Sequence, residues 1–306
     1  MRGDRSGARS GAGGGIGGDP DRRRGFSRDV VGGEQVEGRQ AVRELLVAGR
    51  RRVKELWLVD GLDPSTQLDE IERWCARRHV RVHVVSQRRL DSVARTDAPQ
   101  GVVAFADPIE PVDLDDLCEA SGAAVPMLLV LDGVTDPHNV GSLLRSAACA
   151  GVSGVVLARH RAAHVTPTVA KVAAGAAEHV PIALVPGVPA ALARLADAGV
   201  RCIGLDAHAP TALYDLGGVA DGPVALVLGS EGKGLSQLAR RRCDIVVSIP
   251  QRGGVASLNV ATAGAVACFD LARRRRTAGQ PRAADPIGAG QPGSADPSNV
   301  AARSAR

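Results

Sequence analysis

Apolar positions in the N-terminal part of the chain follow two alternating patterns. Val42, Leu45 and Leu46 recur at helical spacing, whereas residues 53–59 alternate as a strand does. The predicted elements are a helix over 37–48, a strand over 53–59, a helix over 68–78 and strands over 80–85 and 101–106. This order predicts a small α/β layer domain over residues 29–107.

From Val125 onward, short runs of Val, Leu and Ile alternate with helical or loop segments. Nearly continuous apolar runs are typical of parallel strands that helices cover on both faces. Strands are predicted near 127–131, 153–158, 180–185, 201–205, 223–228 and 244–249. Residues 125–276 are therefore expected to form a doubly wound parallel sheet, a fold that binds ligands beyond the carboxyl ends of its strands.

The remaining segments are polar. Residues 108–124 hold five acidic and no basic side chains and predict a linker with one short helix. Residues 1–28 and 277–306 contain few large apolar side chains and are expected to be disordered. Neither a secretory apolar region nor a run approaching the ~20 apolar residues of a membrane span occurs, so we expect a soluble cytoplasmic protein with no membrane partner.

The formal net charge of +5 is unevenly distributed, with +4 on residues 1–28 and +5 on residues 125–276. A basic surface favours phosphate-bearing partners, although this signal is weak on its own. In the first domain the densest basic patch comprises Arg50, Arg51, Arg52 and Lys54, and a solvated charged face is expected for it.

The six cysteines form no CxxC pair, which disfavours both a metal site and a disulfide framework, and most are expected to be small buried hydrophobes. They are Cys75, Cys118, Cys149, Cys202, Cys243 and Cys268. His160, His164 and His179 lack metal-ligand spacing and are interpreted as loop residues. No metal is therefore expected.

Candidate chemistry begins in the stretch from Asp132 to Ala147. Asn139 and Arg145 lie six positions apart at a predicted helix N-terminus, so both are candidates to face one cleft. The alternatives are a helix cap for Asn139 and a surface charge for Arg145, and for Asn139 both roles are compatible.

Two further glycine-bearing turns follow predicted strands. Residues 226–235 carry Glu231 but match neither GxxxxGK[ST] nor GxGxxG, which disfavours a nucleoside triphosphate or dinucleotide site. Residues 249–265 pass from an apolar run through Pro250 and a glycine pair into a small-residue helix pattern. Ser257 lacks the GxSxG elbow of a serine hydrolase, and a short polar residue there is typical of a helix start.

In order and spacing, these stretches resemble the three motifs of the SpoU (TrmH) family of RNA ribose 2′-O-methyltransferases, which belongs to the SPOUT class. The matching residues are Asn139-x-Gly141-x-x-x-Arg145, Gly229-Ser230-Glu231-Gly232-x-Gly234, and Ile249-Pro250 followed by Ser257-Leu258-Asn259. The similarity covers about 125–274. Residues 30–107, with Gly38-Arg39-Gln40-Ala41-Val42 and Gln100-Gly101-Val102-Val103, resemble the L30e-like RNA substrate-binding domain of one subgroup.

The resemblance implies a SPOUT domain with a deep trefoil knot at the carboxyl end of the sheet. It implies S-adenosyl-L-methionine as cofactor, contacted by Gly229, Ile249 and Leu258, and a homodimer whose sites use residues from both subunits. The catalytic and RNA-contacting set would be Asn139, Arg145, Glu231, Ser257 and Asn259. The substrate implied is a guanosine 2′-OH in 23S ribosomal RNA, in the peptidyl-transferase region.

Other functions stay open at this point. Within the class these are a tRNA guanosine methyltransferase and a resistance-type rRNA adenosine methyltransferase. A catalytically silent RNA-binding or ribosome-assembly factor is a different class, and its signature would be damaged motifs, which this chain does not have. A nucleotide-dependent oxidoreductase is disfavoured because no early strand is followed by GxGxxG.

The resemblance raises the question of how Arg145 takes part in the chemistry. A guanidinium normally keeps its proton in proteins, so a literal base role for Arg145 is costly. We expect Arg145 to hold a phosphate and stabilise the developing ribose oxyanion, while Ser257 and Asn259 orient the ribose. With only six aromatic residues and no cluster among them, recognition is expected to use phosphate contacts and RNA shape.

Overall fold

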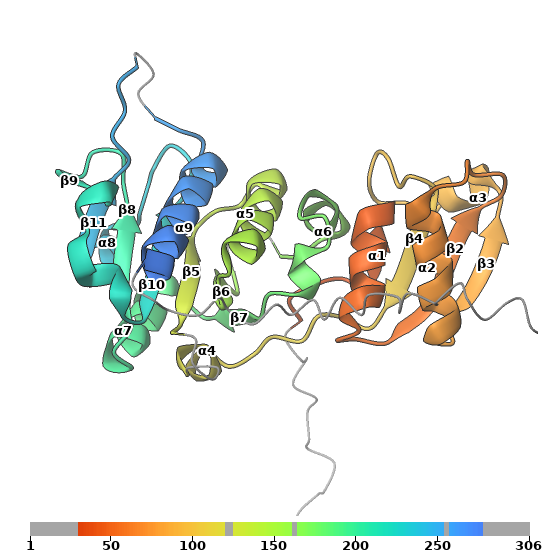
Figure 1. Ribbon diagram of the computed structural model, residues 1–306, viewed down its shortest axis with the longest axis horizontal. Coiled ribbons are helices and arrows are strands. Elements are labelled where there is room, and N and C mark those ends of the chain that lie inside the picture. The colour runs from red at the N-terminus through yellow and green to blue at the C-terminus, as the bar shows by residue number, and fades with distance from the viewer. Residues whose placement is uncertain (1–29, 120–124, 161–163, 254–256, 278–306) are drawn as a thin grey trace, which may run out of the picture.

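The computed structural model describes residues 30–119, 125–160, 164–253 and 257–277. The segments expected to be disordered, residues 1–28 and all but the first residue of 277–306, lie outside these ranges, as does the end of the acidic segment. The described residues form two separate β-sheets, one in each half of the chain (Figure 1).

The N-terminal sheet has the strand order β1-β4-β2-β3. Its strands are β1 (Gln35–Glu37), β2 (Val53–Val59), β3 (Arg81–Val85) and β4 (Val102–Ala106). β4 is antiparallel to both of its neighbours, whereas β2 and β3 run parallel. The pattern of the sequence predicted all of these strands except the short β1.

Three helices belong to this sheet: α1 (Arg39–Ala48), α2 (Thr66–Arg77) and α3 (Gln87–Asp91). The first two pack side by side on one face of the sheet (Figure 1). Alternation in β2 turns Leu56 and Leu58 toward that face, where they join Leu45, Leu46 and Ile71 in one apolar core. The apolar faces of α1, α2 and β2 therefore pack together in one layer of buried side chains.

The C-terminal sheet has the strand order β7-β6-β5-β10-β8-β11-β9, and every pairing in it is parallel. Its strands are β5 (Met127–Asp132), β6 (Gly154–Ala158), β7 (Ile182–Val185), β8 (Arg201–Leu205), β9 (Thr211–Ala212), β10 (Val224–Gly229) and β11 (Ile245–Ser248). The predicted parallel sheet and its six strands are confirmed, and the two-residue β9 is additional.

Helices cover both faces of this sheet, as the unbroken apolar runs predict. Leu129 and Leu131 of β5 point to the face that carries α5 (Pro137–Ala150), α6 (Pro167–Val172) and α9 (Val260–Thr277). Leu128 and Val130 point to the face that carries α4 (Leu114–Cys118), α7 (Val188–Asp197) and α8 (Gln237–Arg242). Short 3-10 turns lie at Ala176–Glu178, Leu213–Asp215 and Gly217–Asp221.

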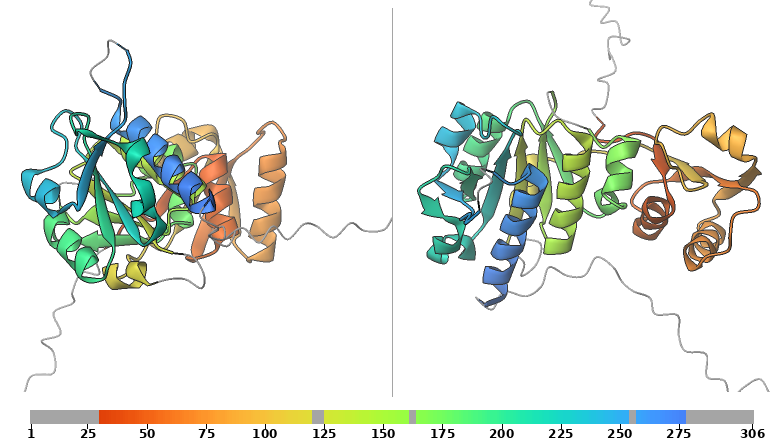
Figure 2. Two further views of the ribbon diagram at one scale, coloured as in Figure 1. Left: turned by 60° about the vertical axis from the view of Figure 1, so that its left-hand side comes forward. Right: turned by 90° about the horizontal axis from the view of Figure 1, so that it is seen from above.

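Helices α5 and α9 lie side by side over the centre of the sheet (Figure 2). Gly264 permits this approach, because a Cβ at that position would overlap the Leu143 side chain of α5 and approach Leu228 of β10. A larger residue at 264 would therefore require the Leu143 and Leu228 side chains or α9 itself to shift. Residues 254–256, between β11 and α9, lie outside the described ranges, and the knot that the resemblance implies stays a prediction.

The far end of α9 is fixed by a buried arginine. Arg275 donates hydrogen bonds to the carbonyls of Val125, Pro126 and Gly222, at distances of 2.7 to 2.9 Å. Burial lowers the pKa of its guanidinium to about 10, partly offset by the charge of Asp221. α9 is thus tied to the segments that enter β5 and β10.

The acidic segment is less of a free linker than its composition predicts. The predicted short helix is present as α4, and its Leu114 and Leu117 are buried in the core beneath the parallel sheet. Val112 donates a backbone hydrogen bond to Ile182 at 3.0 Å. The segment therefore packs along the edge of the C-terminal sheet over its described part.

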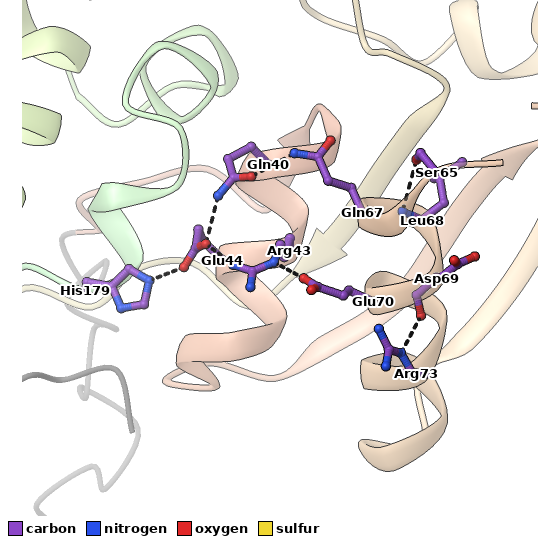
Figure 3. A network of polar contacts seen from close by, with 10 residues as sticks. All are labelled: Gln40, Arg43, Glu44, Ser65, Gln67, Leu68, Asp69, Glu70, Arg73 and His179. Atoms are coloured by element: carbon purple, nitrogen blue, oxygen red, sulfur yellow. Dashed lines mark hydrogen bonds and ion pairs between the residues drawn. The ribbon is translucent and has the colours of Figure 1, made fainter. Parts of the chain in front are cut away.

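Polar contacts join the two halves. His179 and the carboxylate of Glu44 on α1 lie 2.8 Å apart (Figure 3), and Arg51 forms an ion pair with Glu178. Gly175 has φ of +82° and lies against α1, where a Cβ would overlap Glu44. The expectation that the basic patch is a solvated face is wrong for Arg51, since its side chain is only 7% exposed and its partner lies 127 positions away.

Candidate active site

Two predicted turns meet at the carboxyl end of the parallel sheet. β5 and β10 are neighbours, with Asp132 paired to Gly229 at their last positions. The turn after β5 leads into α5, whose first turn carries Asn139, while the turn after β10 carries Glu231. Since parallel strands end at the same edge, neighbouring strands place these polar side chains together.

Asn139, Glu231 and Asn259 form a closed set of hydrogen bonds, which we call the amide–carboxylate triangle. The Asn139 amide donates to one Glu231 oxygen at 3.2 Å, and the Asn259 amide donates to the other at 3.3 Å. Asn259 also donates to the Asn139 carbonyl oxygen at 2.9 Å. One residue from each of the three predicted motifs is thus held in a fixed orientation.

The Asn139 side chain does not cap α5, although the sequence left that role open. Asp136 caps α5 by accepting from the Asn139 backbone N–H at 3.0 Å, so the Asn139 side chain is free for the triangle. Asn259 does cap its helix, because its side-chain oxygen accepts from Ala261 at 2.9 Å and from Thr262 at 3.3 Å. Ser257 does not serve as the cap and is exposed.

The turn after β10 is shaped by its glycines. Ser230 and Gly234 exchange backbone hydrogen bonds of 3.0 and 2.9 Å, and a Cβ at Gly229 would overlap the backbone of Gly234. Asp132 accepts from the Ser236 backbone N–H at 2.8 Å and fixes the far end of the turn. Only glycine at 229 permits this tight return at the edge of the sheet.

The other predicted cofactor contacts follow β11. Ile249 is half-buried against the apolar core, whereas Leu258 is an exposed large hydrophobic side chain, 41% accessible. Ser257 lies next to Leu258, directly before the cap of α9. The intervening Gly254, Val255 and Ala256 lie outside the described residues, so the shape of this loop is not part of the site as described.

Arg145, like Ser257, is a predicted catalytic residue that the single chain does not join to the triangle. It is exposed on α5, whereas Asn139 is 7% exposed, and its guanidinium makes no hydrogen bond or ion pair with any described residue. Six positions correspond to about 240° around a helix, so the two side chains leave α5 in different directions. The expectation that both face one cleft within one chain is not met.

A groove between α5 and α9 borders the triangle. It encloses about 360 Å³ and is lined by His138, Asn139, Ser142, Ser146, Asn259, Ala261, Thr262 and Ala265. Sequence reasoning missed two residues here: His138, which lines the groove, and Asp132, which anchors the turn of Glu231. The sequence offered a signal for each: His138 directly precedes Asn139, and Asp132 directly follows the predicted strand 127–131.

Within the described ranges, no group of three or more His, Cys, Asp or Glu side chains is placed to bind a metal ion. Over the same ranges, no helix combines the length and apolar character needed to cross a bilayer. Of the six cysteines, Cys75, Cys202 and Cys268 are buried as expected, whereas Cys149 is exposed on α5.

Family comparisons agree with the two sheets. The model of the SpoU rRNA Methylase family matches residues 126–269, and the model of the RNA 2′-O ribose methyltransferase substrate binding domain matches residues 35–112. A 23S rRNA (guanosine-2′-O-)-methyltransferase RlmB from Shewanella oneidensis is 39% identical over 79% of this chain and 98% of its own length. The protein of the same name from Pseudomonas aeruginosa is 40% identical over 79% and 97%, respectively.

A solved structure shares the whole arrangement. The AdoMet-bound rRNA methyltransferase from Sinorhizobium meliloti superposes with a TM-score of 0.63 at 26% identity, covering 78% of this chain and 86% of that one. The expected fold class, a C-terminal α/β domain of the SPOUT type preceded by a small α/β domain, is confirmed by this similarity and by the parallel sheet.

Proposed function

Because this chain belongs to the SpoU rRNA methylase family, we propose that it transfers a methyl group from S-adenosyl-L-methionine to the ribose 2′-OH of a guanosine in 23S ribosomal RNA. The observation that carries the proposal is the amide–carboxylate triangle, which joins three motifs at the ligand-binding edge of the sheet. Identity of about 40% along nearly the full length of named guanosine methyltransferases supports the substrate.

The cofactor site would lie at the turn after β10 and the segment after β11. The tight turn at Gly229 exposes backbone donors and acceptors, and Ile249 and Leu258 offer apolar surface to a flat ring. These features fit S-adenosyl-L-methionine bound in a bent form. The bound sulfonium supplies an already activated methyl group, so the protein mainly positions the reactants.

We assign the site residues separate roles. Asn139 and Asn259 each donate to a different oxygen of the Glu231 carboxylate, so that the triangle keeps the turn after β10 against the starts of α5 and α9. Ser257, exposed just before Asn259, would orient the ribose. Arg145 would bind the adjacent phosphate and stabilise the negative charge that develops on the 2′-oxygen.

A homodimer would complete this site. Arg145 points away from the triangle of its own chain, and it shares the exposed side of the α5–α9 layer with Phe269, which is 49% exposed. A second copy seated on this side would bury Phe269 and bring Arg145 to the neighbouring site. The proposal thus commits to a self-complementary contact, as in most symmetric dimers.

Residues 29–107 would be the RNA substrate-binding domain, and residues 125–276 the methyltransferase domain. A hollow of about 840 Å³ in the N-terminal half is lined by Arg39, Gln67, Gln87, Gln100 and their neighbours. Gln100 accepts from the Arg39 backbone N–H at 2.9 Å and adopts φ of +57°, which is uncommon for a residue other than glycine. Amide and guanidinium groups of this kind suit RNA bases and phosphates. Such an enzyme is expected in the cytoplasm.

The test is methyl transfer from labelled S-adenosylmethionine to purified RNA. We expect label in 23S rRNA, resistance of the labelled guanosine to alkaline cleavage, and little label in tRNA. Label in tRNA or at adenosine would identify one of the alternative methyltransferases. Binding of S-adenosylhomocysteine and RNA without transfer would identify a silent RNA-binding factor. Mapping 2′-O-methyl sites in cells with and without the gene would identify the nucleotide.

A further inference from the structure

Methylation of a hydroxyl releases a proton, and the assigned site residues provide no good acceptor for it. The Asn139 and Asn259 amides and the Ser257 hydroxyl are not bases near neutral pH, and a guanidinium keeps its proton. Both oxygens of Glu231 already accept hydrogen bonds from the two asparagines. A group that gains a proton near neutral pH is therefore missing from the assignment.

His138 has the chemistry and the position to supply this group. It is exposed in the first turn of α5, next to Asn139, and lines the groove together with Asn139 and Asn259. It makes no hydrogen bond or ion pair with any described residue, so both ring nitrogens are free to meet a ligand. Imidazole is the side chain that ordinarily exchanges a proton between pH 5 and 8.

Helix geometry also aligns His138 with Arg145. Seven positions correspond to almost two full turns, so the two side chains leave α5 on the same side, about 10 Å apart along the axis. Ser142 lies between them on that side and lines the same groove. In the proposed dimer this side of α5 lies at the contact between the two copies, so His138 of one subunit would meet the RNA beside the arginine that the other subunit contributes.

We propose that His138 is a catalytic residue that accepts the proton of the ribose 2′-OH, an inference that rests on the proposed methyltransferase function. The 2′-oxygen forms a bond to the methyl carbon while the bond from carbon to sulfur breaks and its electron pair stays on sulfur. The hydroxyl proton moves to the unprotonated ring nitrogen of His138 and then to water. Arg145 stabilises the oxygen while the proton leaves.

The charged groups around His138 determine which residue a pH effect can be assigned to. Asp136, the cap of α5, and Arg145 belong to the same helix, and Glu231 accepts a hydrogen bond from the neighbouring Asn139. The residues that α9 contributes to the groove, Ala261, Thr262 and Ala265, do not titrate. A pH effect that disappears on replacing His138 alone therefore belongs to that imidazole.

The experiment compares wild type, His138→Gln and the control His83→Gln, which makes the same replacement in the N-terminal half. Single-turnover methyl transfer to 23S rRNA is measured from pH 5.5 to 9, with binding of S-adenosylhomocysteine and RNA measured in parallel. Wild type and control should gain rate as pH rises through this range, because the proposed acceptor must lose its own proton before it can take one. His138→Gln should be slower by about 100-fold or more at pH 8 and lack that rise, with binding unchanged.

Two results would overturn the inference. One is a His138→Gln rate within about threefold of wild type with the same pH profile. The other is an equal loss of rate and of ligand binding, which would make the residue structural. If wild type itself transfers no methyl group to any RNA, the proposed function fails instead, and that outcome is distinct from both.

Discussion

Arg51 of the N-terminal half and Glu178 of the C-terminal half form a two-pronged ion pair. Nη2 lies 2.5 Å from one carboxylate oxygen and Nε lies 3.0 Å from the other, and the side chains are only 7% and 3% exposed. The same guanidinium donates to the carbonyls of Gly33 and Asp107. This pair fixes the position of one half relative to the other with directional bonds.

Breaking this pair should destabilise the protein strongly. Glu178→Gln leaves Arg51 buried beside a neutral partner, and removing one member of a buried pair costs about 3–5 kcal/mol. Denaturant unfolding should report this loss. Arg194→Gln, which removes an exposed arginine paired with Asp113 and Asp115, should change stability little. An equal loss of stability in the two variants would mean that the pair of Arg51 and Glu178 contributes no more than an exposed ion pair.

The contact between Glu44 and His179 predicts a pH dependence. Burial raises the pKa of the Glu44 carboxyl, but its hydrogen bond to His179 and the charge of Arg43 lower it by more, so the folded-state pKa lies below the ordinary glutamate value. A depressed carboxyl pKa stabilises the fold above the unfolded value, and this contribution disappears as pH falls through the folded value. The stability advantage of wild type over Glu44→Gln should therefore shrink below about pH 4.5. A difference that stays constant from pH 7 to 3 would contradict the assignment.

Arg145→Lys tests the geometric role of the guanidinium. Lysine keeps the positive charge but loses the planar fork that binds phosphate and oxyanion together, so transfer should slow by at least about tenfold. Affinity for S-adenosylhomocysteine should stay at the wild-type level. Arg201→Lys, at the opposite end of the sheet, serves as control. Methylation by Arg145→Lys at the wild-type rate would remove Arg145 from the chemistry.

Gly229→Ala tests the proposed cofactor turn. The added methyl would overlap the backbone of Gly234 and Leu235, so the turn must open. Affinity for S-adenosylhomocysteine should fall by at least about tenfold, equivalent to about 1.4 kcal/mol. Gly187→Ala is a matched control, since a Cβ there meets no atom within 4 Å. Calorimetry measures both, and unchanged binding by Gly229→Ala would place the cofactor elsewhere.

Phe269→Asp tests the dimer. A carboxylate on the exposed side of α9 would have to be desolvated in the proposed contact, so the variant should elute as a monomer and lose most transfer activity. Leu238→Asp changes another exposed apolar residue, on α8 across the sheet, and should leave mass and activity unchanged. A wild-type protein that is active as a monomer by light scattering would rule out the shared site.

Local pattern was sufficient to predict most of the fold. The strand 53–59 was predicted with its observed bounds, because the buried Leu56 and Leu58 alternate with Glu55, Trp57 and Val59, which are only partly buried. The short β1 escaped because three residues cannot establish a period, and β9 for the same reason. Register and strand order depend on packing between distant segments, which one sequence does not display.

The site was predicted in part. The family resemblance named Asn139, Glu231 and Asn259, which the structure brings together, but their mutual hydrogen bonds were invisible until β5 and β10 became neighbours. Arg51 escaped because its partner Glu178 is distant in sequence, and an arginine run is usually a solvated face. Whether the assigned residues bind cofactor and RNA stays a prediction.

The three bonds from Arg275 also constrain how the protein is made. Two of them connect residues 149 and 150 positions apart and the third, to Gly222, spans 53 positions, so the segment that enters β5 receives its partner only after almost the whole C-terminal half has been synthesised. A nascent chain cannot finish this half strand by strand as it leaves the ribosome. Folding of this half is instead completed late, when α9 docks onto the sheet.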